Sequence, residues 1–157
     1  MNISMVLTMP DVENSNEPFI VGAIQRVGCR RPETSDTWSR GGLSAKVHLD
    51  TGLLGRATRS PDGDQKERFT HHPDTGFAIE GVEIPQWEES RTMLLRAARM
   101  VSVLEYVACA IVIGDDDPLA LEANINSAVN VFQPRNRLLI DRRVREYDRL
   151  RRVHVRN

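Results

Sequence analysis

Cysteine is scarce in this chain of 157 residues, with only Cys29 and Cys109 present. The two form no CxxC motif and have no partnering cluster of histidines, which argues against a disulfide framework or a zinc site. Long apolar runs are also absent: the longest, residues 106–113, is far shorter than the roughly 20 residues of a transmembrane helix. The N-terminus lacks the basic segment of a signal peptide. The sequence therefore predicts a cytoplasmic protein.

Lysine is almost missing as well, because Lys46 and Lys66 are the only two among the 21 Lys and Arg. These cations oppose 22 Asp and Glu, and the net charge of −1 makes nucleic acid or an anionic membrane an improbable partner of the whole molecule. The balance is uneven. Residues 135–157 carry nine Arg against three acidic residues, which is +6, so residues 1–134 carry −7. The sequence thus predicts an acidic body, 1–134, and a basic C-terminal helix, 135–157.

Short apolar and β-branched runs, separated by turn residues, predict strands through most of the chain. They cover residues 2–9, 19–27, 43–49, 53–59, 106–113 and 119–124, and a shorter strand is expected near Phe69. Residues 28–42 are rich in Arg, Pro, Thr, Ser and Gly, which predicts a loop with functional potential. Because short turns join neighbouring runs, we expect an antiparallel sheet.

Two segments show helical periodicity instead. Residues 85–102 begin with a proline and two glutamates that suit a helix N-terminus. Their predicted apolar face consists of Trp87, Leu94, Leu95, Ala98 and Val101. In residues 135–157 the predicted apolar side consists of Ile140, Val144, Tyr147 and Leu150, opposite a stripe of arginines. The expected fold is therefore α+β, an antiparallel sheet with packed helices.

Glu122 and Asn124 close the last predicted strand. Residues two apart on a strand point to the same face, so a carboxylate and an amide oxygen lie together. Mg²⁺ prefers oxygen ligands and usually bridges one or two carboxylates to nucleotide phosphates. A polar pair at a strand end is also a common turn-capping device, so on its own the pair leaves both interpretations open.

Several short motifs follow one another along the chain, at residues 2–8, 35–42, 50–52, 72–76, 84–89, 121–126 and 132–133. In order and spacing they resemble the ATP-grasp ligases, in particular the sugar-transfer-associated and alpha-L-glutamate-ligase-related branch. The resemblance implies the C-terminal lobe of an enzyme that grips ATP between two α+β lobes. It also implies Mg²⁺ bound to Glu122 and Asn124. In this family a carboxylate is phosphorylated to an acylphosphate, which an amine then attacks.

The resemblance implies roles for residues in two loops as well. Asp36, Gly41 and Gly42 would shape a loop around the phosphates or the acyl group. His72 and Asp74 would lie on the substrate side. From the residues alone, adjacent histidines are more often part of a turn than metal ligands, so the role of His72 rests on the resemblance.

The chain departs from the family pattern at several positions. An arginine is usual where Met5 stands, Asp-Asn where Asp36-Thr37 stands, and an aspartate metal ligand where Ala110 stands. The family's nucleotide-binding lysines lie in an N-terminal half, and the chain begins at about the second half, so Lys46 and Lys66 are in the wrong places to replace them. We therefore expect weak or absent binding of ATP and Mg²⁺, and no ligase turnover by this polypeptide alone.

Two classes of function stay open on these grounds. One is a truncated, degenerate ATP-grasp ligase-like protein, which would work with a separate N-terminal lobe. The other is a non-catalytic protein or gene fragment derived from such a ligase, whose arginine-rich helix contacts a partner protein. The preserved Glu122 and Asn124 favour the first, and Ala110 favours the second.

Overall fold

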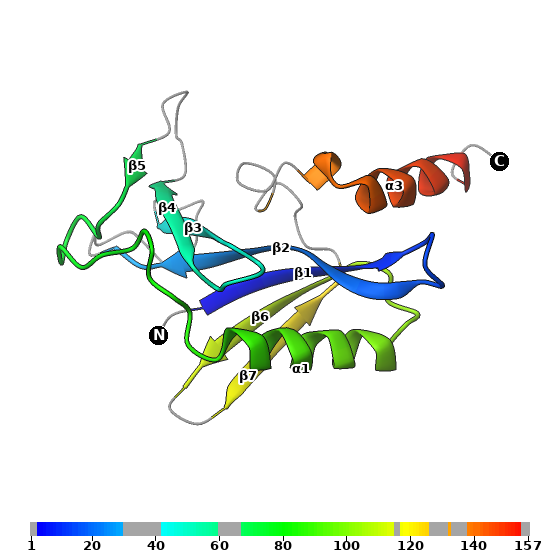
Figure 1. Cartoon of the computed structure of the whole chain (residues 1–157), viewed down its shortest axis with the longest axis horizontal. Helices are drawn as coiled ribbons and strands as arrows, with labels where there is room; N and C mark the ends of the chain where they lie inside the picture. The colour runs from blue at the N-terminus through cyan, green and yellow to red at the C-terminus, as the bar shows by residue number, and fades with distance from the viewer. Residues whose placement is uncertain are drawn as a thin grey trace.

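The computed structural model describes residues 3–29, 42–59, 67–114, 117–125, 132 and 138–154. They form a seven-stranded antiparallel sheet with one helix packed on each face (Figure 1). The strands are β1 (Ile3–Asp11), β2 (Glu17–Val27), β3 (Leu43–Val47), β4 (Leu54–Arg59), β5 (Arg68–Phe69), β6 (Val107–Ile113) and β7 (Pro118–Asn124). The predicted α+β class is confirmed.

The strand order is β5-β4-β3-β2-β1-β6-β7, which places β1 near the centre of the sheet. β1 pairs with β2 through a tight hairpin whose Ser15 and Asn16 have positive φ, of 51° and 59°. On its other side β1 pairs with β6, so the β6–β7 hairpin from later in the chain extends the sheet. The predicted carboxylate-x-amide pair therefore lies on an edge strand.

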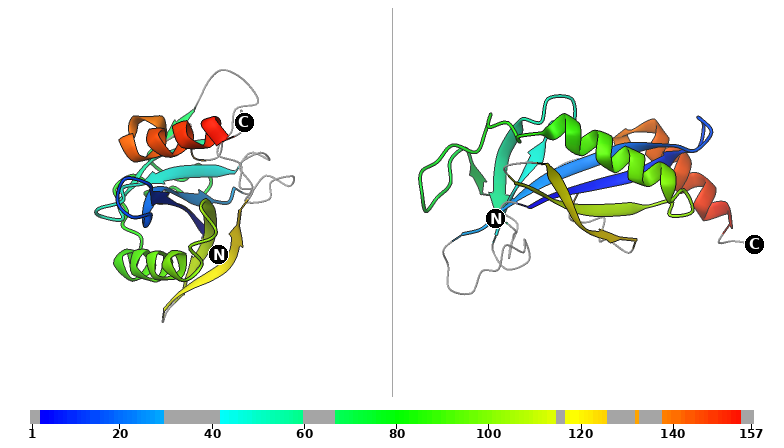
Figure 2. Two further views of the ribbon diagram at one scale, coloured as in Figure 1. Left: turned by 90° about the vertical axis from the view of Figure 1, so that its right-hand side faces the viewer. Right: turned by 90° about the horizontal axis from the view of Figure 1, so that it is seen from below.

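Helix α1 (Trp87–Met100) covers one face of the sheet, as Figure 2 shows. Its buried residues are Trp87, Ser90 and Leu94, which pack on apolar residues from β1 to β4 and β6. The helix is shorter than the predicted 85–102 and ends at Met100. It begins only at Trp87, because Gln86 adopts a left-handed conformation with φ of 53° just before the first turn. Val101 follows the last turn and is exposed, so the predicted apolar face was wrong at that residue.

The opposite face carries a short 3₁₀ helix, η3 (Leu138–Ile140), and helix α3 (Arg142–His154). Leu138 and Val144 are buried there against Leu7, Met9, Phe19, Ile24, Ala108 and Phe132. Ile140 is 67% exposed, because the 3₁₀ turn points it away from the sheet, so its predicted place on the apolar side was wrong. Among the described residues, no helix is both long and apolar enough to cross a membrane.

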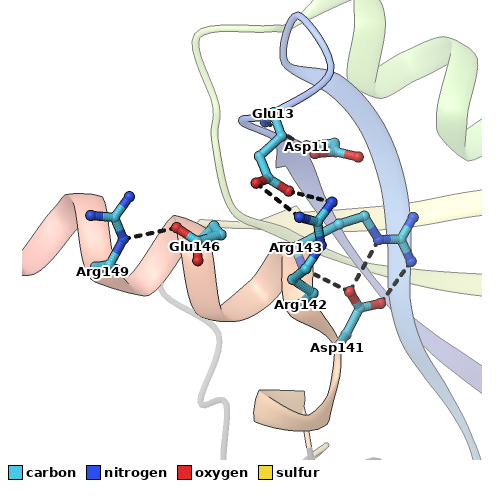
Figure 3. A network of polar contacts seen from close by, with 7 residues as sticks. All are labelled: Asp11, Glu13, Asp141, Arg142, Arg143, Glu146 and Arg149. Carbon is cyan, nitrogen blue, oxygen red and sulfur yellow. Dashed lines mark hydrogen bonds and ion pairs between the residues drawn. The ribbon is translucent and has the colours of Figure 1, made fainter.

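Charged contacts attach the start of α3 to the β1–β2 hairpin (Figure 3). Asp141 accepts a hydrogen bond from the backbone N–H of Arg143 at 2.9 Å and caps the helix. The Arg143 side chain also bonds Asp141 at 2.7 Å and lies 3.8 Å over the Phe19 ring. Arg142 pairs with Glu13 of the hairpin at 2.9 Å. The arginines at the start of α3 thus have partners within the chain.

Candidate functional site

Glu122 and Asn124 lie on edge strand β7, and both are exposed. They pair with Ala110 and Ala108 of β6, so both point to the sheet face that α3 also covers. Their Cα atoms are two residues apart on a strand, roughly 6.7 Å, and their side chains are long enough to share one cation. The register of β7 with β6 thus places Glu122 and Asn124 on one face of the sheet.

The register also aligns three positions that the family resemblance makes functional. Met5 of β1 pairs with Ala110 of β6, and Ala110 pairs with Glu122 of β7. These three residues therefore form one row across neighbouring strands, on the same face of the sheet. In the family pattern this row would read arginine, aspartate and glutamate. Here only the glutamate can bind a cation, and none of the three side chains can bind a phosphate.

Lys46 lies on the same row but at its far end. It pairs with Ile24, which pairs with Met5, so four inter-strand steps separate Lys46 from Glu122. At roughly 4.8 Å per step the two backbones are about 19 Å apart. One lysine side chain cannot span that gap, so Lys46 does not neutralise a phosphate bound at Glu122.

Most of the predicted phosphate or acyl loop lies outside the residues that the structure describes. Asp36 and Gly41, like Lys66, lie outside the described residues. Gly42 is described: it is buried and directly precedes β3. The role of Asp36, Gly41 and Gly42 in a phosphate or acyl loop therefore stays a prediction.

His72 and Asp74 lie in the turn that follows β5. β5 and β7 are the opposite edge strands of the sheet, so this turn does not follow a strand near Glu122. The turn is held to the end of β2 by His72, whose Nε2 lies 2.7 Å from the carbonyl oxygen of Gly28. Its Nδ1 accepts a hydrogen bond from the backbone N–H of Asp74 at 3.1 Å. His72 also lines a cavity of about 700 Å³, together with Gly28, Thr75, Phe77 and Pro85.

A third side chain that can bind a metal, Cys29, lies beside this turn and was not predicted from the sequence. Cys29 is the second residue after the end of β2, and its thiol lies within 4.8 Å of one donor atom each of His72 and Asp74. The residues are separated by more than 40 positions in sequence, and their spacing matches no metal motif. The hydrogen bond between His72 and Gly28 links the turn to the end of β2 across more than 40 positions in sequence, so no local signal could have revealed the group.

Two other segments of the family resemblance meet at a packing contact. Gly52, in the β3–β4 turn, has a φ of +73°, and a Cβ there would lie 2.8 Å from Cβ and Cγ of Trp87. The Trp87 indole N–H donates to the carbonyl oxygen of Leu49 at 2.8 Å. Trp87 is a core residue, as expected, and the glycine of residues 50–52 serves close packing.

Cys109 has the structural role that its apolar strand predicts. It is half-buried in β6 and packs against the core on the α1 face. Burial raises the pKa of its thiol, because the thiolate is poorly solvated there. A thiol with a raised pKa is a poor nucleophile, so Cys109 is not a candidate catalytic residue.

The α+β fold, a seven-stranded antiparallel sheet with a helix on each face, is consistent with a lobe of the kind found in ATP-grasp proteins. Comparison with family models supports the same conclusion. The model of the sugar-transfer associated ATP-grasp family matches residues 6–149, and the chain belongs to this family. Membership makes it an ATP-grasp ligase-like protein of an ATP-binding family. No curated protein and no solved structure matches it.

Proposed function

We propose that this chain is the C-terminal lobe of an ATP-grasp ligase-like protein whose own nucleotide site is impaired. The family reaction joins a carboxylate to an amine through an acylphosphate, with ATP and Mg²⁺. Phosphoryl transfer of this kind depends on cations and positioned donors, which stabilise the charge on the phosphates. We propose that the site is impaired because this chain lacks groups that would hold or supply those cations.

The single observation that carries the proposal is the row of Met5, Ala110 and Glu122. Mg²⁺ between protein and nucleotide usually takes one or two carboxylates, and a nearby guanidinium would bind the phosphates. Here a thioether and a methyl group stand beside one carboxylate, and Ala110 is only 3% exposed. The residues present fit a complete Mg²⁺-nucleotide site poorly, so no catalytic step is assigned to this chain.

Turnover would then need groups from elsewhere. The described residues form a single sheet with its helices, whereas the family reaction takes place between two lobes. We propose that a separate N-terminal lobe or another partner protein supplies the missing cations. The second candidate function, a non-catalytic interaction protein, is favoured by the same alanine at position 110.

Titration of the chain with Mg²⁺-ATP tests the proposal, with isothermal titration calorimetry as the measurement. Wild type and Glu122→Gln should both show weak or undetectable binding at millimolar nucleotide. Ala110→Asp restores a carboxylate opposite Glu122 and should raise the Mg²⁺-dependent affinity, provided that circular dichroism shows the variant folded. The combined Ala110→Asp and Glu122→Gln variant is the matched control and should lose the gain.

Micromolar, Mg²⁺-dependent binding by wild type that disappears in Glu122→Gln would contradict the impairment. A folded Ala110→Asp variant without any gain would contradict the assignment of this row to the nucleotide site and favour the interaction protein.

A further inference from the structure

Cys29, His72 and Asp74 bring three different metal-binding groups to one place. One donor atom from each, the thiol sulfur, an imidazole nitrogen and a carboxylate oxygen, all lie within 4.8 Å of one another. Cys29 and His72 are partly buried and Asp74 is exposed, so the group is open to solvent on one side. Such an arrangement has room for an ion with a free coordination position.

The hydrogen bond between Nε2 and the Gly28 carbonyl fixes which ring nitrogen of His72 can bind a metal. The Gly28 carbonyl oxygen can only accept, so Nε2 carries the proton in the 2.7 Å contact between them. Nδ1 is then unprotonated and accepts a hydrogen bond from the Asp74 N–H. A metal would bind through the same lone pair, so the Asp74 N–H has to release Nδ1 when the metal binds. Metal-binding histidines typically donate their other N–H to a backbone carbonyl or a carboxylate, which fixes the tautomer and the ring orientation.

From these contacts we propose that Cys29, His72 and Asp74 form a site for a divalent transition metal, with Zn²⁺ the best fit. Sulfur and imidazole ligands favour Zn²⁺ over Mg²⁺ or Ca²⁺, which select oxygen. Three protein ligands and one water make a tetrahedral zinc site, whose donor atoms lie roughly 3.5 Å apart. The donor atoms lie within 4.8 Å of one another, so each pair needs to approach by at most about 1.3 Å. The thiol loses its proton to solvent on binding, so affinity rises with pH.

This inference goes beyond the proposed function and does not depend on it. β1 and β6 separate β2, which Cys29 follows, from β7, which carries Glu122. The metal would tie the turn after β5 to the end of β2, at the mouth of the cavity lined by His72 and Gly28. It would reinforce the link made by the hydrogen bond between those two residues.

Titration of the reduced full chain with Co²⁺ and with Zn²⁺ tests the site. We expect one equivalent of Co²⁺ to bind and to give a near-ultraviolet charge-transfer band from a thiolate ligand, and Zn²⁺ to displace it. Cys29→Ser should abolish the band and weaken Zn²⁺ binding by more than the roughly 10–100-fold that loss of an outer hydrogen bond costs. Asp74→Asn should weaken it less.

Matched controls change the other cysteine, the adjacent histidine and a carboxylate on the distant strand β7. Cys109→Ala, His71→Gln and Glu122→Gln should bind one Co²⁺ with an unchanged band and affinity. Binding that is equal in Cys29→Ser and Cys109→Ala, or no stoichiometric binding by wild type, would overturn the site. Because Glu122→Gln tests the nucleotide row and Cys29→Ser tests the metal, failure of one proposal leaves the other measurable.

Discussion

The two faces of the sheet hold their helices by different forces. α1 inserts Trp87 and Leu94 into an apolar core that draws on five strands. α3 buries Val144, but its first turn is positioned by the charged contacts of Arg142 and Arg143. Exposed ion pairs contribute roughly 0–1 kcal/mol each, whereas a buried leucine contributes several-fold more. α1 is therefore part of the folded core, while α3 is the helix that salt and pH can loosen.

The largest test of this contrast is Leu94→Ala on α1. Leu94 is 2% exposed, and removal of its side chain leaves a cavity beneath the helix. We expect the free energy of unfolding to fall by about 3 kcal/mol. Met100→Ala on the same helix is the control, because Met100 is 79% exposed and should change stability by less than about 0.5 kcal/mol. Urea denaturation measures both.

Gly52→Ala tests the contact beneath the start of α1. The new methyl group would lie 2.8 Å from Trp87, at a backbone φ of +73° that L residues rarely adopt. We expect a loss of about 2–3 kcal/mol from strain and overpacking together. Gly81→Ala has a similar φ of +81° but no atom within 4 Å, and should lose only about 1 kcal/mol. Equal losses in urea denaturation would show that Trp87 does not pack as described.

Asp141→Ala probes the charged attachment of α3 and should have the smallest effect. It removes the helix cap and the partner of Arg143, and we expect a loss of about 1 kcal/mol. Asp141→Asn keeps a capping oxygen and should lose less. A loss larger than that of Leu94→Ala would reverse the comparison of the two faces.

The same carboxylate gives a pH dependence with a defined sign. Hydrogen bonds from Arg143 lower the pKa of Asp141 below its ordinary value. Its contribution to stability is therefore present above the unfolded-state pKa, roughly 4, and is lost as the pH falls through the lower folded-state pKa. The difference between wild type and Asp141→Asn should shrink below about pH 4. Urea titrations at a series of pH values measure it.

Most of the sheet was predictable from local patterns. The alternation in residues 43–49 and the turn at residues 50–52 predict the β3–β4 hairpin that the structure contains. The ends of the helices were less predictable, because they depend on backbone conformation. Nothing in the composition marks Gln86 as left-handed, and nothing places Ile140 in a 3₁₀ turn.

The candidate sites divide in the same way. The common face of Glu122 and Asn124 follows from strand periodicity alone. Their alignment with Met5 and Ala110 requires the pairing of β1 with β6, which sequence periodicity does not specify. The approach of Cys29 to His72 joins segments more than 40 residues apart, with a long-range hydrogen bond between His72 and Gly28, so only the tertiary structure reveals it.

The packing of Trp87 on Gly52 also determines how this part of the molecule opens. The N–H of Leu54 donates to the carbonyl oxygen of Val82 at 2.8 Å, and the N–H of Ile84 donates to that of Gly52 at 3.0 Å. Both hydrogen bonds protect their amides from exchange with solvent, and both join the β3–β4 region to the segment just before Trp87. They are therefore expected to exchange with solvent hydrogen together, in one opening event that frees the β3–β4 turn and the first turn of α1 as a single unit.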